Sequence, residues 1–215
     1  MSHRFEKNAG IALLAGSFLM IATMILHPAG GDLKHLIKIQ KIIIVSHSLA
    51  LLSIPFSFVG FLGLTRRLGT EHFLSLTAFS VMSFGLVAAL GAAATNGLAL
   101  PFFLQDYQEA SPETLATVKI MVRYNFALNH AFDYILLGAM WLAILFWSVT
   151  ALLTSKLHQA IGYLGLSLTL VAGILITAGY DFVSLQGFRL FVLGSVVWIA
   201  LVGVAMIRSR TVRKE

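Results

Sequence analysis

The side chains most able to do chemistry in this chain lie in one short stretch. Asn129, His130 and Asp133 are spaced by three and four residues, so on a helix they share one face. An imidazole beside a carboxylate can titrate near neutral pH, ligate a metal ion or hydrogen-bond a polar ligand. Asp133 lies inside a long apolar run, and a carboxylate in hydrocarbon costs at least about 2.5 kcal/mol. We therefore expect it to face other helices and to have a partner.

Further polar residues occur near one end of the other apolar runs. His27 ends the first run, His47 lies near the start of the second, Asn96 near the end of the third, and Tyr180 and Asp181 follow the fifth. If the runs are membrane helices, all of these ends lie in the outer third of the bilayer. The sequence therefore predicts an outward-facing polar pocket lined by His27, His47, Asn96, Asn129, His130, Asp133, Tyr180 and Asp181. A structural interpretation stays open: polar residues are common at helix ends, and a His and Asp pair can hold helices together.

A metal site is one chemistry that such a pocket could support. Zinc is bound by neutral imidazoles and carboxylates, and catalytic zinc takes three such ligands and water. His47, His130 and Asp133 would supply them, with His27 able to replace one, and the zinc hydroxide could hydrolyse an amide or ester near the headgroups. The arrangement is similar to that of intramembrane zinc amidases of the ceramidase type, but no motif of the chain matches theirs, and it has no H-E-x-x-H.

Three other interpretations remain. His47 and His130 could be axial ligands of a haem b, the pair of His130 and Asp133 could serve proton-coupled transport, or the polar residues could only contact partner subunits of a scaffold. The chain has no P-loop, G-x-G-x-x-G or G-x-S-x-G, which argues against nucleotide and serine-hydrolase chemistry. The first choice is binding of a small-molecule or lipid-derived ligand, with or without a metal, and whether the protein is an enzyme stays open.

The elements that must position these residues are transmembrane helices. Of the 215 residues, 58% are hydrophobic and 11% are charged, and none is cysteine. This composition excludes a soluble domain and a disordered chain, and the lack of cysteine excludes disulfides and thiolate metal sites. Six runs reach the about 20 apolar residues that a bilayer-spanning helix needs. We expect a single all-α domain over residues 1–215, a six-transmembrane-helix bundle with spans near 9–28, 42–64, 73–100, 126–153, 157–180 and 188–207.

The distribution of basic residues predicts the orientation of this bundle. Six crossings put both termini on one side, and cytoplasmic segments carry the excess of Lys and Arg. With the termini inside, the inner segments hold nine basic residues: Arg4, Lys7, Arg66, Arg67, Lys156, Arg208, Arg210, Arg213 and Lys214. The outer segments hold six: Lys34, Lys38, Lys41, Lys119, Arg123 and Arg189. We expect a bacterial cytoplasmic membrane protein with both termini cytoplasmic and the lipid bilayer as its main partner. The net charge is +6, but the basic residues do not form a stripe interleaved with aromatic residues, as they do in nucleic-acid-binding proteins.

Two outer connections carry helix-start signals. Asp32 can cap a short helix that leads into the second span, and Ser111 followed by Pro112 is typical of a helix N-terminus. Apolar residues at helical spacing after Ser111 predict a short amphipathic helix on the outer surface. Small residues over 85–94, and Gly162, Gly165 and Gly173, predict close helix packing.

Overall fold

The protein is a bundle of long helices. The computed structural model describes residues 3–208, and over this range the chain forms helices and connections without a strand. Six helices are long and apolar enough to cross a membrane, which confirms the predicted all-α fold of a multi-pass membrane protein. The elements are α1 (His3–Leu26), α2 (Leu33–Lys38), α3 (Gln40–Leu68), α4 (Phe73–Ala94), the π-helix η1 (Thr95–Ala99), α5 (Leu100–Gln105), α6 (Pro112–Thr154), α7 (Gln159–Thr177) and α8 (Leu185–Arg208).

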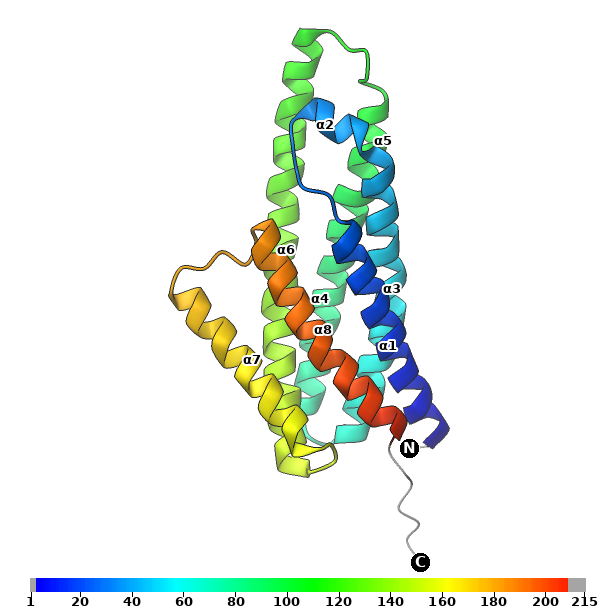
Figure 1. The fold of residues 1–215 in the computed structure, drawn as a ribbon, viewed down its shortest axis with the longest axis vertical. Helices are drawn as coiled ribbons and strands as arrows, with labels where there is room; N and C mark the ends of the chain where they lie inside the picture. The colour runs from blue at the N-terminus through cyan, green and yellow to red at the C-terminus, as the bar shows by residue number, and fades with distance from the viewer. Residues whose placement is uncertain (1–2, 209–215) are drawn as a thin grey trace, which may run out of the picture.

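The long helices pack side by side in a closed arrangement (Figure 1). Helix α1 lies between α3 and α8, α4 lies between α3 and α6, and α7 packs against α6 and α8. The first described residues and the end of α8 lie at the same end of the bundle, which we call the inner end. The opposite, outer end carries α2, α5 and the start of α6 (Figure 1). The basic residues Arg210, Arg213 and Lys214 lie outside the described range.

Small residues allow the helices to approach closely. A Cβ added at Gly85 in α4 would lie 2.8 Å from the Cβ of Ala139 in α6. One added at Gly165 in α7 would overlap the Ser148 hydroxyl, whereas one at Gly173 would meet only Trp141, at 3.7 Å. Gly162 is also in tight contact, since a Cβ there would lie 2.6 Å from Leu152. Gly85, Gly162 and Gly165 therefore lie where a larger side chain would push the helices apart.

Aromatic side chains fill the core of the inner half. Trp147 in α6 is 1% exposed, and its ring stacks on Phe61 of α3 with centroids 5.0 Å apart and on Trp198 of α8 at 6.5 Å. The Trp147 indole N–H donates to the Thr65 hydroxyl over 3.0 Å. The stack therefore joins three helices, and its central polar atom is hydrogen-bonded.

Charged side chains tie the inner ends of the helices together. Arg67 at the end of α3 forms an ion pair with Glu6 of α1 and donates two hydrogen bonds, of 3.0 and 2.7 Å, to the Lys156 carbonyl between α6 and α7. The Lys156 ammonium in turn donates to the Leu68 carbonyl over 3.1 Å and lies 3.6 Å from the Glu71 carboxylate. These contacts link three separate segments at the inner end of the bundle.

Helix α6 is much longer than a bilayer requires. Its 43 residues extend about 65 Å at about 1.5 Å per residue, whereas the 19 residues of α7 extend about 29 Å, close to the thickness of a hydrocarbon core. Figure 1 shows α6 continuing outward past the end of α1 and past the connection between α7 and α8. The outer part of α6, with α2, α5 and the start of α3, extends beyond the outer ends of α1 and α7 (Figure 1).

This projection corrects one expectation about the outer loop. Ser111 caps a helix as predicted, accepting the Thr114 N–H over 3.3 Å, and Asp32 likewise accepts the His35 N–H over 2.8 Å. The expected separate surface helix is instead the first part of α6, because residues 113–137 contain neither glycine nor proline to end it. Its apolar face packs in an outer core, which comprises Leu36, Ile43, Leu100, Leu104, Val118 and Val122.

A π turn interrupts the helix that precedes α6. The Leu100 N–H bonds to the carbonyl of Thr95, five residues earlier. Leu100 separates the widened turn from Pro101, which has no N–H to donate. The helix continues beyond the expected end of the third span to Gln105. Such π turns occur often at functional sites, and this one carries Asn96.

Candidate functional site

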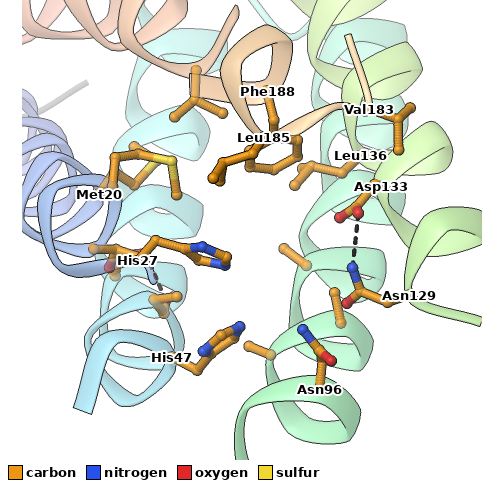
Figure 2. A pocket seen from close by; sticks show the side chains of 18 of the residues that line it. Met20, His27, His47, Asn96, Asn129, Asp133, Leu136, Val183, Leu185 and Phe188 are labelled. Atoms are coloured by element: carbon orange, nitrogen blue, oxygen red, sulfur yellow. Dashed lines mark hydrogen bonds between the residues drawn. The ribbon is translucent and has the colours of Figure 1, made fainter. Parts of the chain in front are cut away.

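A cavity of about 380 Å³ lies between α1, α3, α4, α6 and α8. Six of the eight predicted site residues line it: His27, His47, Asn96, Asn129, His130 and Asp133. Figure 2 shows His27 and His47 on one side, facing Asn96, Asn129 and Asp133 on the other. Residues from four distant parts of the sequence thus line one cavity from two facing sides (Figure 2).

Tyr180 and Asp181 do not line this cavity. Tyr180 is 40% exposed, and its ring lies 4.9 Å from that of Phe182. The Asp181 carboxylate accepts the N–H groups of Val183, over 2.8 Å, and Ser184, over 3.2 Å, just before α8. The structure gives Asp181 the role of a turn-capping residue at the helix start.

The two histidines on one wall contact each other. His27 follows the last turn of α1 and His47 lies in the second turn of α3, and their ring centroids are 5.1 Å apart. Helix η1 packs closely against His47, because a Cβ added at Gly97 would overlap the His47 side chain. Glycine at this position therefore allows the π turn and α3 to approach closely enough to place Asn96 opposite the histidines.

Hydrogen bonds fix the tautomers of both imidazoles. The Nδ1 atom of His47 lies 2.8 Å from the Ile43 carbonyl, and Nδ1 of His27 lies 3.1 Å from the Pro28 carbonyl. A carbonyl oxygen can only accept, so Nδ1 is the donor in each ring and Nε2 of the neutral ring is an acceptor. His27 lies outside the first span, and burial, followed by the neighbouring His47, lowers its pKa to about 4. The His27 imidazole is therefore neutral at neutral pH.

Amide side chains organise the opposite wall. The Asn125 amide donates to the Asn96 side-chain carbonyl over 3.1 Å and so links α6 to the π turn. One turn further along α6, the Asn129 amide donates to the Asp133 carboxylate over 2.8 Å. The exposed His130 also lines the cavity, but no hydrogen bond or ion pair joins it to Asp133. The partner of Asp133 on its own helix is thus Asn129, four residues away, and not His130, three residues away.

Apolar side chains form the rest of the cavity and extend it towards the inner end. They include Phe61, Met82, Leu86, Leu136, Met140 and Ile199. Phe61 follows His47 in α3 by fourteen residues, which is about 21 Å along a helix. The cavity is therefore long and mostly apolar, with its imidazole, amide and carboxylate groups at the outer end and the hydroxyls of Ser53 and Ser57 further in, whereas the sequence had predicted a polar pocket.

Sequence reasoning did not identify this apolar part. Met20, Thr23 and His27 recur at the spacing of one helix face and all line the cavity, as do Asp133, Leu136 and Met140 in α6. This periodicity was the only signal present. It does not separate a cavity from a lipid-facing surface, because both are apolar stripes at the same spacing.

The described residues do not group the predicted zinc ligands. Within residues 3–208 no three His, Cys, Asp or Glu side chains are grouped so that they could hold a metal ion, so His47, His130 and Asp133 do not form the predicted zinc site. For a haem b, the hydrogen bond from His47 Nδ1 to a carbonyl leaves Nε2 free, as an axial ligand requires, so the haem interpretation stays a prediction. The chemistry that the wall offers is hydrogen bonding.

A comparison of the chain with protein-family models, with curated proteins and with solved structures finds no match in any of the three.

Proposed function

We propose that the protein binds an amphiphilic small molecule or a lipid-derived ligand in the cavity between α1, α3, α4, α6 and α8. One observation carries the proposal: a single cavity joins a cluster of hydrogen-bonding side chains at its outer end to an apolar body that reaches Phe61 and Ile199. A ligand with a polar head and a hydrocarbon tail is complementary to such a lining. A ligand that is polar throughout would leave the inner part unfilled.

The position of the polar end supports binding from the lipid phase. His27 directly follows the end of α1, and the guanidinium of Arg189, near the start of α8, donates to its carbonyl over 2.7 Å. The polar end therefore lies at the level where two spans end, which is where headgroups meet hydrocarbon. An amphiphile of the outer leaflet would have its head at this depth. We assign the outer end to the extracytoplasmic side because the sequence assigns nine of the fifteen basic residues to segments on the same side as the termini.

A scaffold without chemistry is the main alternative. Helix surfaces that only bind partner helices are filled by small residues and present their polar groups outward. Here five helices of one chain surround the polar groups, and His27 and His47 turn inward towards Asn96 and Asp133 (Figure 2). The arrangement favours a ligand inside the bundle over a partner outside it.

The proposal can be tested by photolabelling the full chain in lipid nanodiscs. The probe is decanol carrying a diazirine near the end of its tail, and mass spectrometry locates the labelled residues. We expect labelling of cavity residues such as Met82, Leu86 and Met140, and competition by unmodified decanol. Labelling confined to side chains that face lipid, such as Phe84 or Leu90, would contradict the proposal.

A matched pair of variants makes this test independent of partitioning into the bilayer. Ala89→Phe places a large side chain in the cavity wall, whereas Ala131→Phe places the same side chain on an exposed face of α6 at similar depth. We expect Ala89→Phe to reduce cavity labelling at least about tenfold, equivalent to about 1.4 kcal/mol, and Ala131→Phe to leave it unchanged. Equal labelling of the two variants would overturn the proposal.

A further inference from the structure

The polar end of the cavity has an excess of hydrogen-bond acceptors. Nε2 of His27 and of His47 are acceptors because Nδ1 of each ring donates to a backbone carbonyl. The Asp133 carboxylate accepts one hydrogen bond, from Asn129, and has further acceptor capacity. The side-chain amide of Asn96, whose carbonyl already accepts from Asn125, is the main donor on the facing wall. A ligand that fills this space must therefore bring donors.

Within residues 3–208 the lining holds one carboxylate and no ammonium or guanidinium group, together with the imidazoles of His27, His47 and His130. Asp133 is the only Asp or Glu among the residues that line the cavity, and no Lys or Arg lines it. Asp133 has no ion-pair partner within the described part of the chain. Arg189 is the nearest cation to His27, but its guanidinium donates to the His27 carbonyl and lies behind the wall. A half-buried carboxylate at a membrane boundary is stabilised by a cation. Since none of the described Lys and Arg residues lines the cavity, a ligand can supply this cation.

We propose that the ligand is a cationic amphiphile, an alkylamine whose ammonium binds Asp133 and whose tail occupies the apolar body. This inference rests on the proposed function. A primary ammonium offers three donors and no acceptor, which is the complement of a lining that combines one carboxylate with two acceptor imidazoles. A carboxylate or phosphate head would bring a second anion and further acceptors to the same place, and it is disfavoured by repulsion from Asp133. A hydroxyl head can donate one hydrogen bond but does not neutralise the charge.

The inference can be tested with three ligands that share one tail. Decylamine, decanol and decanoate compete against the diazirine-tailed decanol probe on the wild-type chain and on the Asp133→Asn variant in nanodiscs of neutral lipid at neutral pH. For the wild type we expect affinity to fall in the order decylamine, decanol, decanoate. In Asp133→Asn we expect decylamine to bind at least about tenfold more weakly, equivalent to about 1.4 kcal/mol, and decanol to bind as before.

Each amphiphile partitions into lipid equally in the wild-type and Asp133→Asn samples. A comparison of the two proteins with the same ligand is therefore independent of this partitioning. Unchanged decanol binding would show that the variant is folded. We expect it to fold because asparagine is isosteric with aspartate and can still accept from Asn129. As a charge control, Asp106→Asn removes one carboxylate from an exposed position at the end of α5, and we expect it to leave the order of affinities unchanged.

The outcomes separate this inference from the proposed function. If none of the three amphiphiles competes for the cavity, the proposed function fails. If all three compete but decylamine gains nothing over decanol, or keeps its affinity in Asp133→Asn, only the cationic head is refuted. Preferential binding of decanoate would likewise refute the cationic head and would indicate a site governed by Arg189.

Discussion

The two ends of the bundle use their polar groups in different ways. At the inner end, Arg67 contacts Glu6 and the Lys156 carbonyl, and Trp147 donates to Thr65. At the outer end, the polar groups surround a cavity and several of their acceptor atoms face it. Polar side chains join elements at both ends, since Arg189 donates to the His27 carbonyl and Asn125 to Asn96 at the outer end. In the described part of the structure, only the outer of the two ends also has polar side chains that line a cavity of this size.

This difference separates the polar residues that stabilise the fold from those that are available to bind a ligand. Buried polar groups are normally hydrogen-bonded within the protein, and the exceptions concentrate where a ligand completes the set. We therefore expect substitutions at the inner end to lower the stability of the protein, and substitutions at the outer end to change binding with smaller costs in stability.

The largest expected loss of stability follows from removing the centre of the inner aromatic stack. Trp147→Ala deletes a side chain that is 1% exposed and contacts Phe61 and Trp198, and we expect a cost of about 3 to 5 kcal/mol. The measurement is reversible unfolding in mixed micelles with increasing SDS. Phe188→Ala, which removes a half-buried aromatic ring from the cavity wall, should cost about 1 to 2 kcal/mol. An equal cost for the two variants would remove the contrast between the ends.

A somewhat smaller loss is expected from breaking the inner ion pair. The side chains of Arg67 and Glu6 are only 18% and 15% exposed, so Arg67→Ala leaves a mostly buried carboxylate without its guanidinium and should cost about 3 kcal/mol. The double variant with Glu6→Gln should recover part of this loss, because it also removes the charge. The same SDS titration measures both, and a double variant less stable than Arg67→Ala would contradict this account.

The contact between the π turn and α3 gives the next prediction. Gly97→Ala forces a methyl group against His47, and we expect a cost of about 1 to 3 kcal/mol together with weaker labelling of the cavity by the decanol probe. Gly138→Ala is the matched control, since a Cβ there meets no atom within 4 Å. It should leave labelling unchanged and stabilise α6 by up to about 1 kcal/mol. Loss of labelling in both Gly97→Ala and Gly138→Ala would show that the effect does not depend on the contact between Gly97 and His47.

Much of the fold could be predicted from the sequence because the bilayer imposes a length on each apolar run. The helix ends were harder to predict. The residues after Ser111 have the same amphipathic pattern in a separate surface helix and in the first turns of a longer one, and only the absence of a helix breaker over 113–137 distinguishes them. The π turn at Thr95–Ala99 left no pattern in the sequence, since it depends on how α4 packs against α3.

The candidate site could be predicted in part for a similar reason. Polar side chains in a membrane helix avoid lipid, so His47, Asn129 and Asp133 were expected to face the interior together. Asp181 could not be separated from them, because a carboxylate at a helix start has the same sequence signature in a cap and in a pocket. The partner of Asp133 was also not predictable, because positions three and four residues away share its face and side-chain rotamers select between them.

The smallest effect is expected at the exposed rim of the inner end, where Glu71 meets Lys156 outside the membrane spans. A hydrogen bond from its own backbone N–H, followed by the charges of Lys156 and His72, lowers the pKa of Glu71. Since the carboxyl titrates at lower pH when folded than when unfolded, its contribution to stability is present at neutral pH and is lost as the pH falls through the lowered value. Glu71→Gln should therefore melt slightly below the wild type at neutral pH, and the two melting temperatures should converge on acidification below the ordinary carboxyl range. A difference that grows in acid would mean that Glu71 acts at the inner end through packing and not through its charge.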